Sequence, residues 1–340
     1  MNTEIPDKTV AQAELLFNRL SKRFRHLKKW ARRIGTNAFR LYDRDIPEIP
    51  LVLDLYGDAV SGALYKRPFE KDEAEEEAWL LAMKAAASRA LDIPESRIFL
   101  KERRRMRDRQ ESGNQYGKIP GKSFYRDVKE GDLVFRVNLS DYLDTGLFLD
   151  ARKKRALIRA EAAEKRVLNL FAYTSTLSVA AAKGGALKVD SVDLSNTYLE
   201  WSRINFALNG LEEQDAFGFI RSDVMQFISQ AAKKRLRWDL IILDPPSFSN
   251  SKKMSGVLDI KRDHRELIRS CLSLLIPGGT LWFSSNAKGF NPESGNLTGY
   301  IMKDMGKAII DEDFRGKRIP LCFTFTDTQV MQDICPRDPL

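Results

Sequence analysis

The stretch from Trp238 to Phe248, WDLIILDPPSF, decides the fold of this chain. Its first six residues are almost wholly apolar, which predicts a buried β-strand. Two consecutive prolines then remove backbone N–H donors, so the strand must end near Leu243. A buried strand that ends in a rigid polar turn is typical of a parallel sheet, in which ligands bind beyond the carboxyl ends of the strands.

Similar apolar runs lie on both sides of this strand and alternate with amphipathic segments. We expect strands over 167–171, 189–194, 216–220, 238–243 and 280–284, and helices over 177–182, 198–208, 224–235 and 260–276. The last of these helices would end at Pro277-Gly278-Gly279. This alternation predicts a doubly wound, Rossmann-like α/β fold with helices on both faces of a mostly parallel sheet.

The first part of the chain has a different pattern. A basic helix over 8–34, ended by Gly35, precedes strand-like segments and one further helix that opens on an acidic run. The strand-like segments are 38–42, 51–56, 59–65, 98–101, 123–128 and 133–138. We therefore predict a smaller mixed α+β domain over residues 1–137, followed by the α/β domain over residues 138–340.

Positive charge is clustered. The chain carries a formal net charge of +9, and its Lys and Arg residues concentrate in stretches 19–44, 97–109 and 152–166. Clustered cations suit a polyanion, because each neutralised phosphate releases condensed counterions. A solvated helix surface is the alternative interpretation of each single cluster.

Several kinds of site are disfavoured. Only His26, His264 and the scattered Cys271, Cys322 and Cys335 are available, which argues against a Ser-His-Asp triad, a disulfide framework or a metal site. The chain has no apolar run long enough for a membrane span and no apolar leader after its first residue. We expect a reduced, cytoplasmic protein without a metal or a membrane partner.

Carboxylates follow three of the predicted strands. Asp193 is suited to accept hydrogen bonds from two ribose hydroxyls, and Asp223 from an exocyclic adenine amine, although Asp is also a common helix N-cap. After the strand at 238–243, the prolines would hold Asp244 outward to accept from an amino group on a planar ring. Phe248 can stack against such a ring. The alternative is a rigid turn that merely ends a strand.

Together these motifs resemble a known family. NLFAYT (169–174), DLS (193–195), DPPSFSNSK (244–252) and DTGLFLD (144–150) are similar to those of bacterial large-subunit rRNA methyltransferases of the K type. Such enzymes make 7-methylguanosine in 23S rRNA and are often fused behind an L-type N2-guanine methyltransferase. The resemblance runs over most of the chain and implies a class I methyltransferase that uses S-adenosylmethionine and lacks the L half.

The resemblance also implies roles for individual residues. The cofactor-binding residues would be Phe148, Asp150, Arg152, Asn169, Phe171, Tyr173, Thr174, Asp193, Ser195, Asp223 and Asp244. The residues at the reacting base would be Asp244, Pro245, Pro246 and Phe248. From the basic residues themselves we expect RNA contacts at Arg23, Arg25, Lys28, Lys29, Arg32, Arg33, Arg103, Arg104, Arg105, Lys252 and Lys253. One departure is Ser175, which stands where the family usually has a glycine that lets the backbone approach a ligand.

The absence of a cysteine from these motifs disfavours one class of methyl acceptor. Methylation of C5 of cytosine needs a thiolate nucleophile, and relatives that perform it carry a cysteine where this chain has Ser285. The missing cysteine leaves guanine N7 and an exocyclic amine equally open as acceptors. The resemblance implies N7, so we predict direct, non-covalent transfer to N7 of a flipped guanine in 23S rRNA, either free or in a large-subunit assembly intermediate. The alternatives are an exocyclic-amine or C5-cytosine rRNA methyltransferase, an RNA-binding protein with a relic cofactor pocket, and a methyltransferase for small molecules or proteins.

Overall fold

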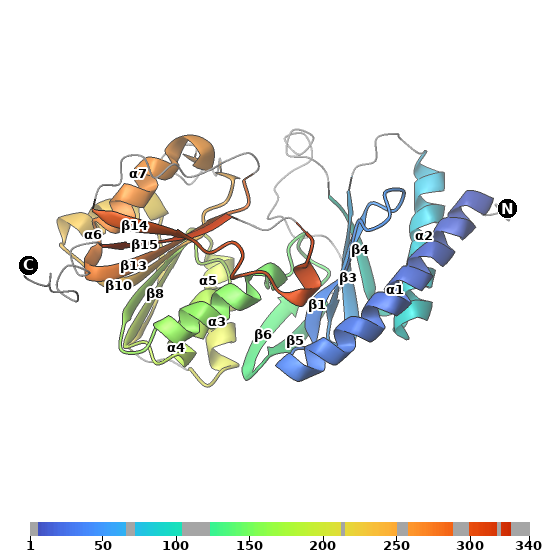
Figure 1. Cartoon of the computed structure of the whole chain (residues 1–340), viewed down its shortest axis with the longest axis horizontal. Helices are drawn as coiled ribbons and strands as arrows, with labels where there is room; N and C mark the ends of the chain where they lie inside the picture. The colour runs from blue at the N-terminus through green and yellow to red at the C-terminus, as the bar shows by residue number, and fades with distance from the viewer. Residues whose placement is uncertain are drawn as a thin grey trace, which may run out of the picture. The chain divides into compact units, whose positions relative to one another are not determined.

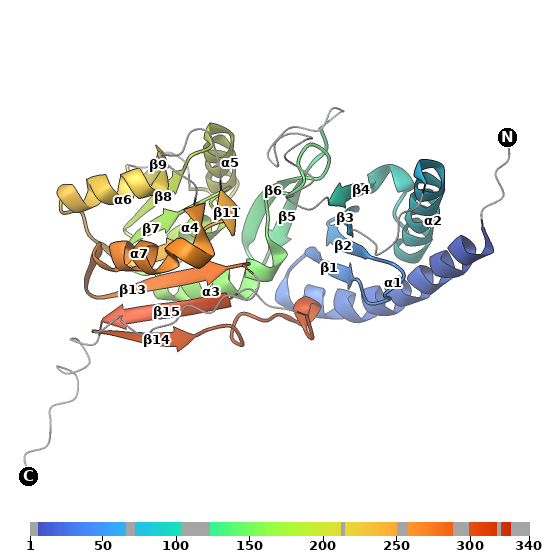
Figure 2. The same ribbon diagram turned by 90° about the horizontal axis from the view of Figure 1, so that it is seen from above.

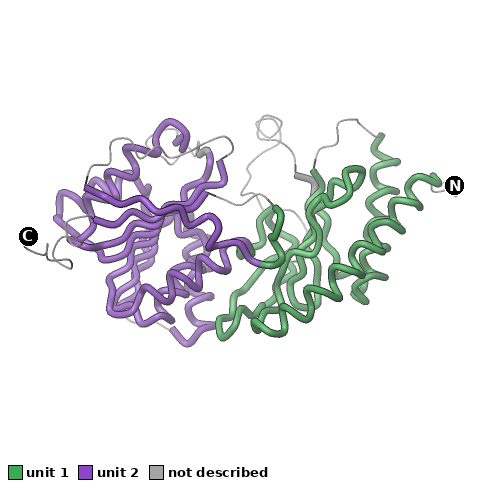
Figure 3. Tube along the Cα trace, in the orientation of Figure 1, with its two compact units in different colours: residues 1–149, 312–317 green, residues 150–311, 318–340 purple. Residues whose placement is uncertain are grey.

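The computed structural model describes residues 6–65, 72–103, 123–211, 215–249, 258–287, 299–317 and 321–327. Contacts divide the chain into two compact units, residues 1–149 with 312–317 and residues 150–311 with 318–340 (Figure 3). The first unit thus ends later than the predicted boundary at 137, and it takes in a short segment from much later in the chain. That the two units fold as separate domains stays a prediction.

The first unit is a mixed α+β structure. Its helices are α1 (Asp7–Ile34) and α2 (Glu73–Leu91), and its strands are β1 (Ala38–Asp43), β2 (Leu51–Tyr56), β3 (Ala59–Tyr65), β4 (Ile98–Arg103), β5 (Tyr125–Glu130) and β6 (Leu133–Asn138). Strands β1 to β4 form one sheet in sequence order, whereas β5 and β6 form a separate hairpin. The helices lie side by side (Figure 1), joined by a hydrogen bond of 2.6 Å from Trp79 Nε1 to Gln12 Oε1. Gly35 ends α1 in the left-handed conformation, as the sequence predicts.

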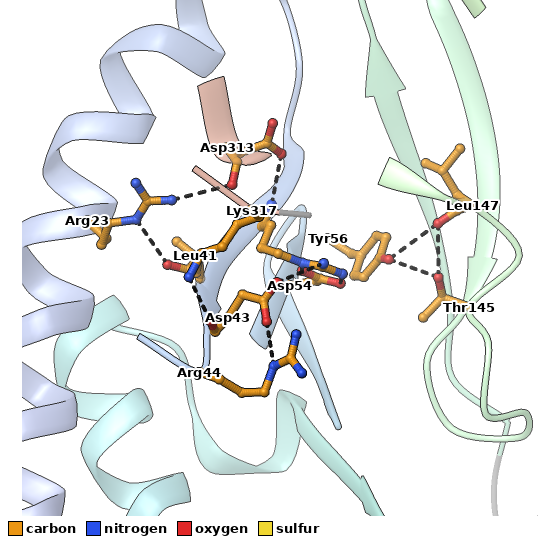
Figure 4. A network of polar contacts seen from close by, with 11 residues as sticks. Arg23, Leu41, Asp43, Arg44, Asp54, Tyr56, Thr145, Leu147, Asp313 and Lys317 are labelled. Atoms are coloured by element: carbon orange, nitrogen blue, oxygen red, sulfur yellow. Dashed lines mark hydrogen bonds and ion pairs between the residues drawn. The ribbon is translucent and has the colours of Figure 1, made fainter. Parts of the chain in front are cut away.

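The segment 312–317 is bound into the first unit by polar contacts (Figure 4). It begins with a 3-10 turn, η3 (Glu312–Phe314), in which Asp313 is almost fully buried. The Asp313 carboxylate accepts from the backbone N–H of Arg40 at 3.0 Å, and Lys317 Nζ donates to Asp43 O at 2.7 Å. The sequence pattern did not predict that this segment contacts the first unit, because its hydrogen-bond partners are about 270 residues away in the chain.

The second unit contains a doubly wound sheet, as predicted. Its strands are β7 (Arg166–Leu170), β8 (Lys188–Asp193), β9 (Phe217–Arg221), β10 (Trp238–Leu243), β13 (Leu275–Ser285), β14 (Tyr300–Asp304) and β15 (Leu321–Asp327). Their order is β14-β15-β13-β10-β7-β8-β9, with β13, β10, β7, β8 and β9 parallel and β15 antiparallel to both its neighbours. The strand order reverses between β7 and β10, which marks the switch point where such folds bind ligands.

Helices cover both faces of this sheet (Figures 1 and 2). They are α3 (Arg152–Glu161), α4 (Thr176–Lys183), α5 (Asn196–Ala207), α6 (Val224–Lys233) and α7 (Ile260–Leu272). Apolar residues of α6 and α7 pack with Trp238, Leu281 and Phe283 into one buried cluster, so these helices cover one face. Helices α3, α4 and α5 lie on the other. Within the described residues, no helix is long and apolar enough to cross a membrane.

One predicted boundary is wrong. Instead of running to Ile276, α7 ends at Leu272, and Leu275 already pairs with Trp238 of β10. The register then shifts, so that Leu240 pairs with Thr280 and the residues between them bulge out of the ladder. Gly278 has a φ of 78° within this bulge. The Pro-Gly-Gly segment therefore lies inside a strand, because the neighbouring strand holds both of its ends.

Candidate active site

The loops that follow β7, β8 and β9 are hydrogen-bonded to one another at one edge of the sheet. Ala172 donates its N–H to Val192 O at 3.0 Å, and Tyr173 donates to Asp193 Oδ2 at 2.9 Å. The N–H of Ser222 reaches Asp193 O at 3.1 Å. Asp193 therefore joins three of the strand ends that the sequence singled out.

The Asp193 carboxylate is held by backbone donors. Its second oxygen, Oδ1, accepts from the N–H of Ser195 at 2.9 Å, and Ser195 in turn caps α5. Burial raises the pKa of Asp193, an effect that its backbone hydrogen bonds partly offset. Each carboxylate oxygen has a further acceptor position, which fits the two ribose hydroxyls of an adenosyl group.

Asp223 fills the N-cap role that the sequence offered as one alternative, and its adenine-binding role stays a prediction. Its Oδ1 caps α6, accepting from Met225 N at 2.9 Å and Gln226 N at 3.1 Å. Its Oδ2 is buried and accepts no hydrogen bond from the residues that the structure describes. Because a buried acceptor without a donor is unfavourable, this oxygen fits an incoming donor such as the adenine amine. The residues thus fit S-adenosylmethionine.

The loop after β7 has an unusual backbone. Phe171, Tyr173 and Ser175 have φ angles of 57°, 52° and 56°, in the left-handed region that glycine favours. Ser175 is fully buried, and its hydroxyl donates to Ser202 Oγ of α5 at 2.7 Å. This bond contributes about 1 kcal/mol, which offsets strain of similar size at a non-glycine residue. The loop thus keeps the conformation that glycine would allow.

Asn169 and Thr174 are buried under this loop. Asn169 Nδ2 donates to Ser178 Oγ at 2.9 Å, while its Oδ1 is another buried acceptor with no partner among the described residues. The carbonyl of Thr174 accepts from Asn205 Nδ2 at 2.9 Å. Ser178 and Asn205 were not predicted, since polar residues inside helices give no sequence signal for such contacts.

Asp244 lies at the carboxyl end of β10, and both of its oxygens are engaged. Lys154 Nζ of α3 is 2.7 Å from Oδ2, and Ser284 Oγ of β13 donates to Oδ1 at 2.7 Å. Lys154 also donates to Ser284 Oγ at 2.8 Å. Sequence reasoning predicted Asp244 but missed both partners. Ser284 was noted as an ordinary strand residue, and Lys154 as one cation of a basic stretch.

The prolines after Asp244 lead into a short hairpin. Pro245 is buried, and Ser247 O accepts from the N–H of Ile260 at 3.4 Å. Strand β11 (Phe248–Ser249) then pairs with β12 (Leu258–Asp259). The side chain of Phe248 lies outside the described part of the structure, so its stacking on a base stays a prediction.

Phe148, Asp150 and Arg152 were predicted to contact the cofactor, but Arg152 has a protein partner. Phe148 is 44% exposed near the end of the first unit, and Asp150 begins the second. Arg152 is buried, with Nη1 3.0 Å from Asp311 Oδ2. A cofactor role for these three residues stays a prediction.

The third basic stretch is only partly the solvated or polyanion-binding surface that the sequence suggested, since Lys153 and Arg166 are exposed but other cations are not. Arg152, Lys154 and Arg155 of α3 are all buried, at 6%, 4% and 0% exposure. The reason is that the buried carboxylate of Asp311 and the partly exposed carboxylate of Asp244 lie opposite the first two.

The first basic stretch, in contrast, is largely exposed on α1. Its exposed predicted RNA contacts are Arg25, Lys28, Lys29, Arg32 and Arg33. Arg23 is half-buried and donates to the carbonyls of Leu41 and Asp313, which gives it a structural role. The remaining predicted contacts, the side chain of Arg103 and all of Arg104, Arg105, Lys252 and Lys253, lie outside the described residues.

The described cysteines are unsuited to nucleophilic attack. Cys271 lies buried within α7, and burial raises its pKa. Burial likewise raises the pKa of Cys322 on β15 to about 12. His264 is buried with Nδ1 3.1 Å from the carbonyl of Ile260. In the described ranges, no group of three or more His, Cys, Asp or Glu side chains is placed to hold a metal ion.

Known proteins share this fold and these motifs. The family model for S-adenosylmethionine-dependent methyltransferases matches residues 54–298. Ribosomal RNA large subunit methyltransferase K of Neisseria meningitidis is 44% identical over 308 residues, which is 90% of this chain and 85% of that protein. The K/L protein of Pseudomonas putida is also 44% identical, but this chain spans only 41% of its length.

Solved structures agree with the sequence relatives. SMU.776, crystallised with S-adenosylhomocysteine, superposes with a TM-score of 0.69 at 26% identity, over 92% of this chain and 81% of that one. A protein from Streptococcus mutans gives a TM-score of 0.72 at 25% identity over the same shares. The chain therefore belongs to the S-adenosylmethionine-dependent methyltransferases, in the family of the large-subunit ribosomal RNA methyltransferases K.

Proposed function

We propose that this enzyme transfers the methyl group of S-adenosylmethionine directly to N7 of a guanine in 23S rRNA. The observation that carries the direct route is the Asp244 site. Its carboxylate is fixed through both oxygens by Lys154 and Ser284, and the described part of the unit offers no reactive thiol beside it. The family likeness supports rRNA as the substrate.

N7 of guanine suits such a site. It has a lone pair in the plane of the ring and loses no proton when it forms the new N–C bond. When bound, the cofactor supplies an electrophilic methyl group. The protein then has to align the base with that group and exclude water, which needs positioned dipoles but no general base.

Transfer to C5 of cytosine is a poorer fit. That reaction needs a thiolate to attack the neighbouring ring carbon. At the strand position where relatives place the nucleophile, this chain has Ser285, which is buried in β13. Cys322 lies on the adjacent strand, but burial raises its pKa to about 12, so its thiol stays protonated near neutral pH.

The exposed cations of α1 support an RNA partner. In A-form RNA, N7 faces a deep and narrow groove, so the target base must be unpaired or flipped before it can react. Contacts to phosphates by Arg25, Lys29, Arg32 and Arg33 would hold the RNA while this happens. The substrate would be 23S rRNA or a large-subunit assembly intermediate, and the protein would act in the cytoplasm.

The direct test is methylation in vitro. Purified protein is incubated with methyl-labelled cofactor and either naked 23S rRNA or immature large subunits, and the digested nucleosides are identified by mass spectrometry. We expect label in 7-methylguanosine, and none with the Asp244→Ala variant. Label in N2-methylguanosine would show that the acceptor is an exocyclic amine, and label in 5-methylcytidine would show that it is C5 of cytosine. Absence of cofactor binding by calorimetry would instead support an RNA-binding protein with a relic pocket.

A further inference from the structure

A buried lysine lies next to the central carboxylate of the site. Lys154 has only 4% of its surface exposed, and its ammonium group lies 2.7 Å from Asp244 Oδ2 and 2.8 Å from Ser284 Oγ. It projects from the first turn of α3, whereas the carboxylate follows β10, some 90 residues later. Three elements of the sheet and its helix layer, α3, β10 and β13, thus meet at one carboxylate.

Burial of this amine requires an explanation. A buried ammonium is costly unless it is paired and hydrogen-bonded, and packing alone would be served better by an apolar side chain. The adjacent residue Lys153 is exposed, as is usual for lysine. The pairing is also asymmetric, since the Lys154 side chain is 5% exposed and that of Asp244 is 31% exposed. The carboxylate therefore faces the open edge of the sheet, and the lysine supports it from behind.

We infer that Lys154 is a positioning residue that neutralises Asp244 and, with Ser284, locks its orientation. This inference rests on the proposed function and deepens it by restricting the kind of methyl acceptor. Lys154 and Ser284 each hold one oxygen of Asp244, so the carboxylate is fixed as a hydrogen-bond acceptor. An amine must release a proton during methylation, whereas guanine N7 has none to release. The pair thus favours an acceptor with a free lone pair.

The charge balance has a consequence for cofactor binding that needs no RNA. S-adenosylmethionine carries a positive sulfonium, and S-adenosylhomocysteine has a neutral sulfur with the same amino acid and adenosine groups. A neutralised Asp244 attracts the two ligands almost equally. Removing the Lys154 charge would leave a net negative site, which would favour the sulfonium over the thioether by about tenfold.

Titration calorimetry with both ligands tests the inference. For Lys154→Met, the ratio of the Kd for S-adenosylhomocysteine to that for S-adenosylmethionine should rise about tenfold. The matched control, Lys153→Met, removes the same charge one residue away on the exposed side and should leave the ratio unchanged. The double variant K154M/D244N removes both charges and should restore the original ratio.

Two further variants keep the test decisive. If K154M does not fold, Lys154→Gln removes the charge while keeping a donor, and the same rise is expected. Ser284→Ala removes a donor without changing charge, so it should leave the ratio as it is while slowing methyl transfer. An unchanged ratio in folded K154M or K154Q would overturn the inference. Because calorimetry uses no RNA, its outcome is independent of whether 23S rRNA is the substrate.

Discussion

Two basic helices of this protein, α1 and α3, have similar compositions and opposite surroundings. In α1, residues such as Arg25, Lys29 and Arg32 are exposed. In α3, Arg152 and Lys154 are buried against carboxylates. These exposed cations of α1 are thus available to a partner, whereas Arg152 and Lys154 of α3 hold elements of the second unit together. The difference shows that a charge cluster in a sequence predicts a function only once its exposure is known.

The largest difference should appear in stability. Arg152→Met would remove the guanidinium that lies 3.0 Å from the Asp311 carboxylate, which is 10% exposed. Breaking such a buried pair costs about 3–5 kcal/mol. Arg32→Met on α1 should change the free energy of unfolding by less than about 0.5 kcal/mol, since Arg32 is exposed. Urea unfolding of both variants measures this, and equal effects would erase the distinction between the helices.

For RNA binding, in contrast to stability, substitutions in α1 should have the larger effect. Replacing Arg25, Lys29, Arg32 and Arg33 by alanine should weaken binding to 23S rRNA fragments by about tenfold or more at moderate salt. The slope of log K against log salt should also fall by roughly 0.7 to 0.9 for each phosphate that the variant no longer neutralises. Filter binding across a salt series measures both quantities. The affinity for the cofactor should not change. A salt slope equal to that of the wild type would mean that α1 does not contact RNA.

Sequence reasoning predicted the carboxylates of the site but not what holds them. Asp193, Asp223 and Asp244 lie at or just after the carboxyl ends of β8, β9 and β10, so strand periodicity alone predicted them at one edge of the sheet. The sequence could not show that the Lys154 side chain points into the site. Its position depends on hydrogen bonds to Asp244 and Ser284, which come from distant elements.

The same limit applies to other parts of the chain. Local patterning predicts a helix over residues 274–276, but pairing of Leu275 with β10 makes them part of a strand. The role of Ser175 also required its distant partner, Ser202. Local patterns thus predicted the element types, whereas contacts between distant residues decided the ends and the supporting network.

One basic residue of α1 resembles those of α3 and gives a smaller, pH-dependent effect. Arg19 pairs with the mostly buried Asp45 at 2.7 Å, and Lys317 pairs with the same carboxylate. Burial raises the pKa of Asp45, but the hydrogen bonds from Lys317 and Arg19 outweigh it and lower the pKa below its usual value. The stabilisation is therefore present at neutral pH and is lost as the pH falls through the lowered pKa.

Asp45→Asn tests this linkage. At pH 7 the variant should be less stable than the wild type by about 1 kcal/mol, because the pair is partly exposed. The difference should shrink as the pH falls below the ordinary range of an Asp, where the wild-type carboxylate becomes protonated. Thermal unfolding of the wild type and the variant between pH 7 and pH 2 measures this difference in stability. A difference that is constant with pH would mean that charge pairing plays no part.

The smallest effect is expected from the exposed side of α3. Lys153→Glu reverses a charge beside the buried pair, yet it should alter RNA affinity by less than about twofold and stability by less than about 0.5 kcal/mol. The measurements are the same filter-binding and urea assays. A loss of RNA affinity as large as that of the α1 variant would show that the exposed side of α3 also contacts RNA.

We propose that this protein makes 7-methylguanosine in 23S rRNA. The most direct measurement is mass spectrometry of 23S rRNA nucleosides from cells that lack the gene, complemented with wild type, Lys153→Met or Asp244→Ala. We predict that 7-methylguanosine disappears in the deletion strain, returns with wild type and Lys153→Met, and stays absent with Asp244→Ala. A deletion strain whose 7-methylguanosine content equals that of its parent would contradict the account.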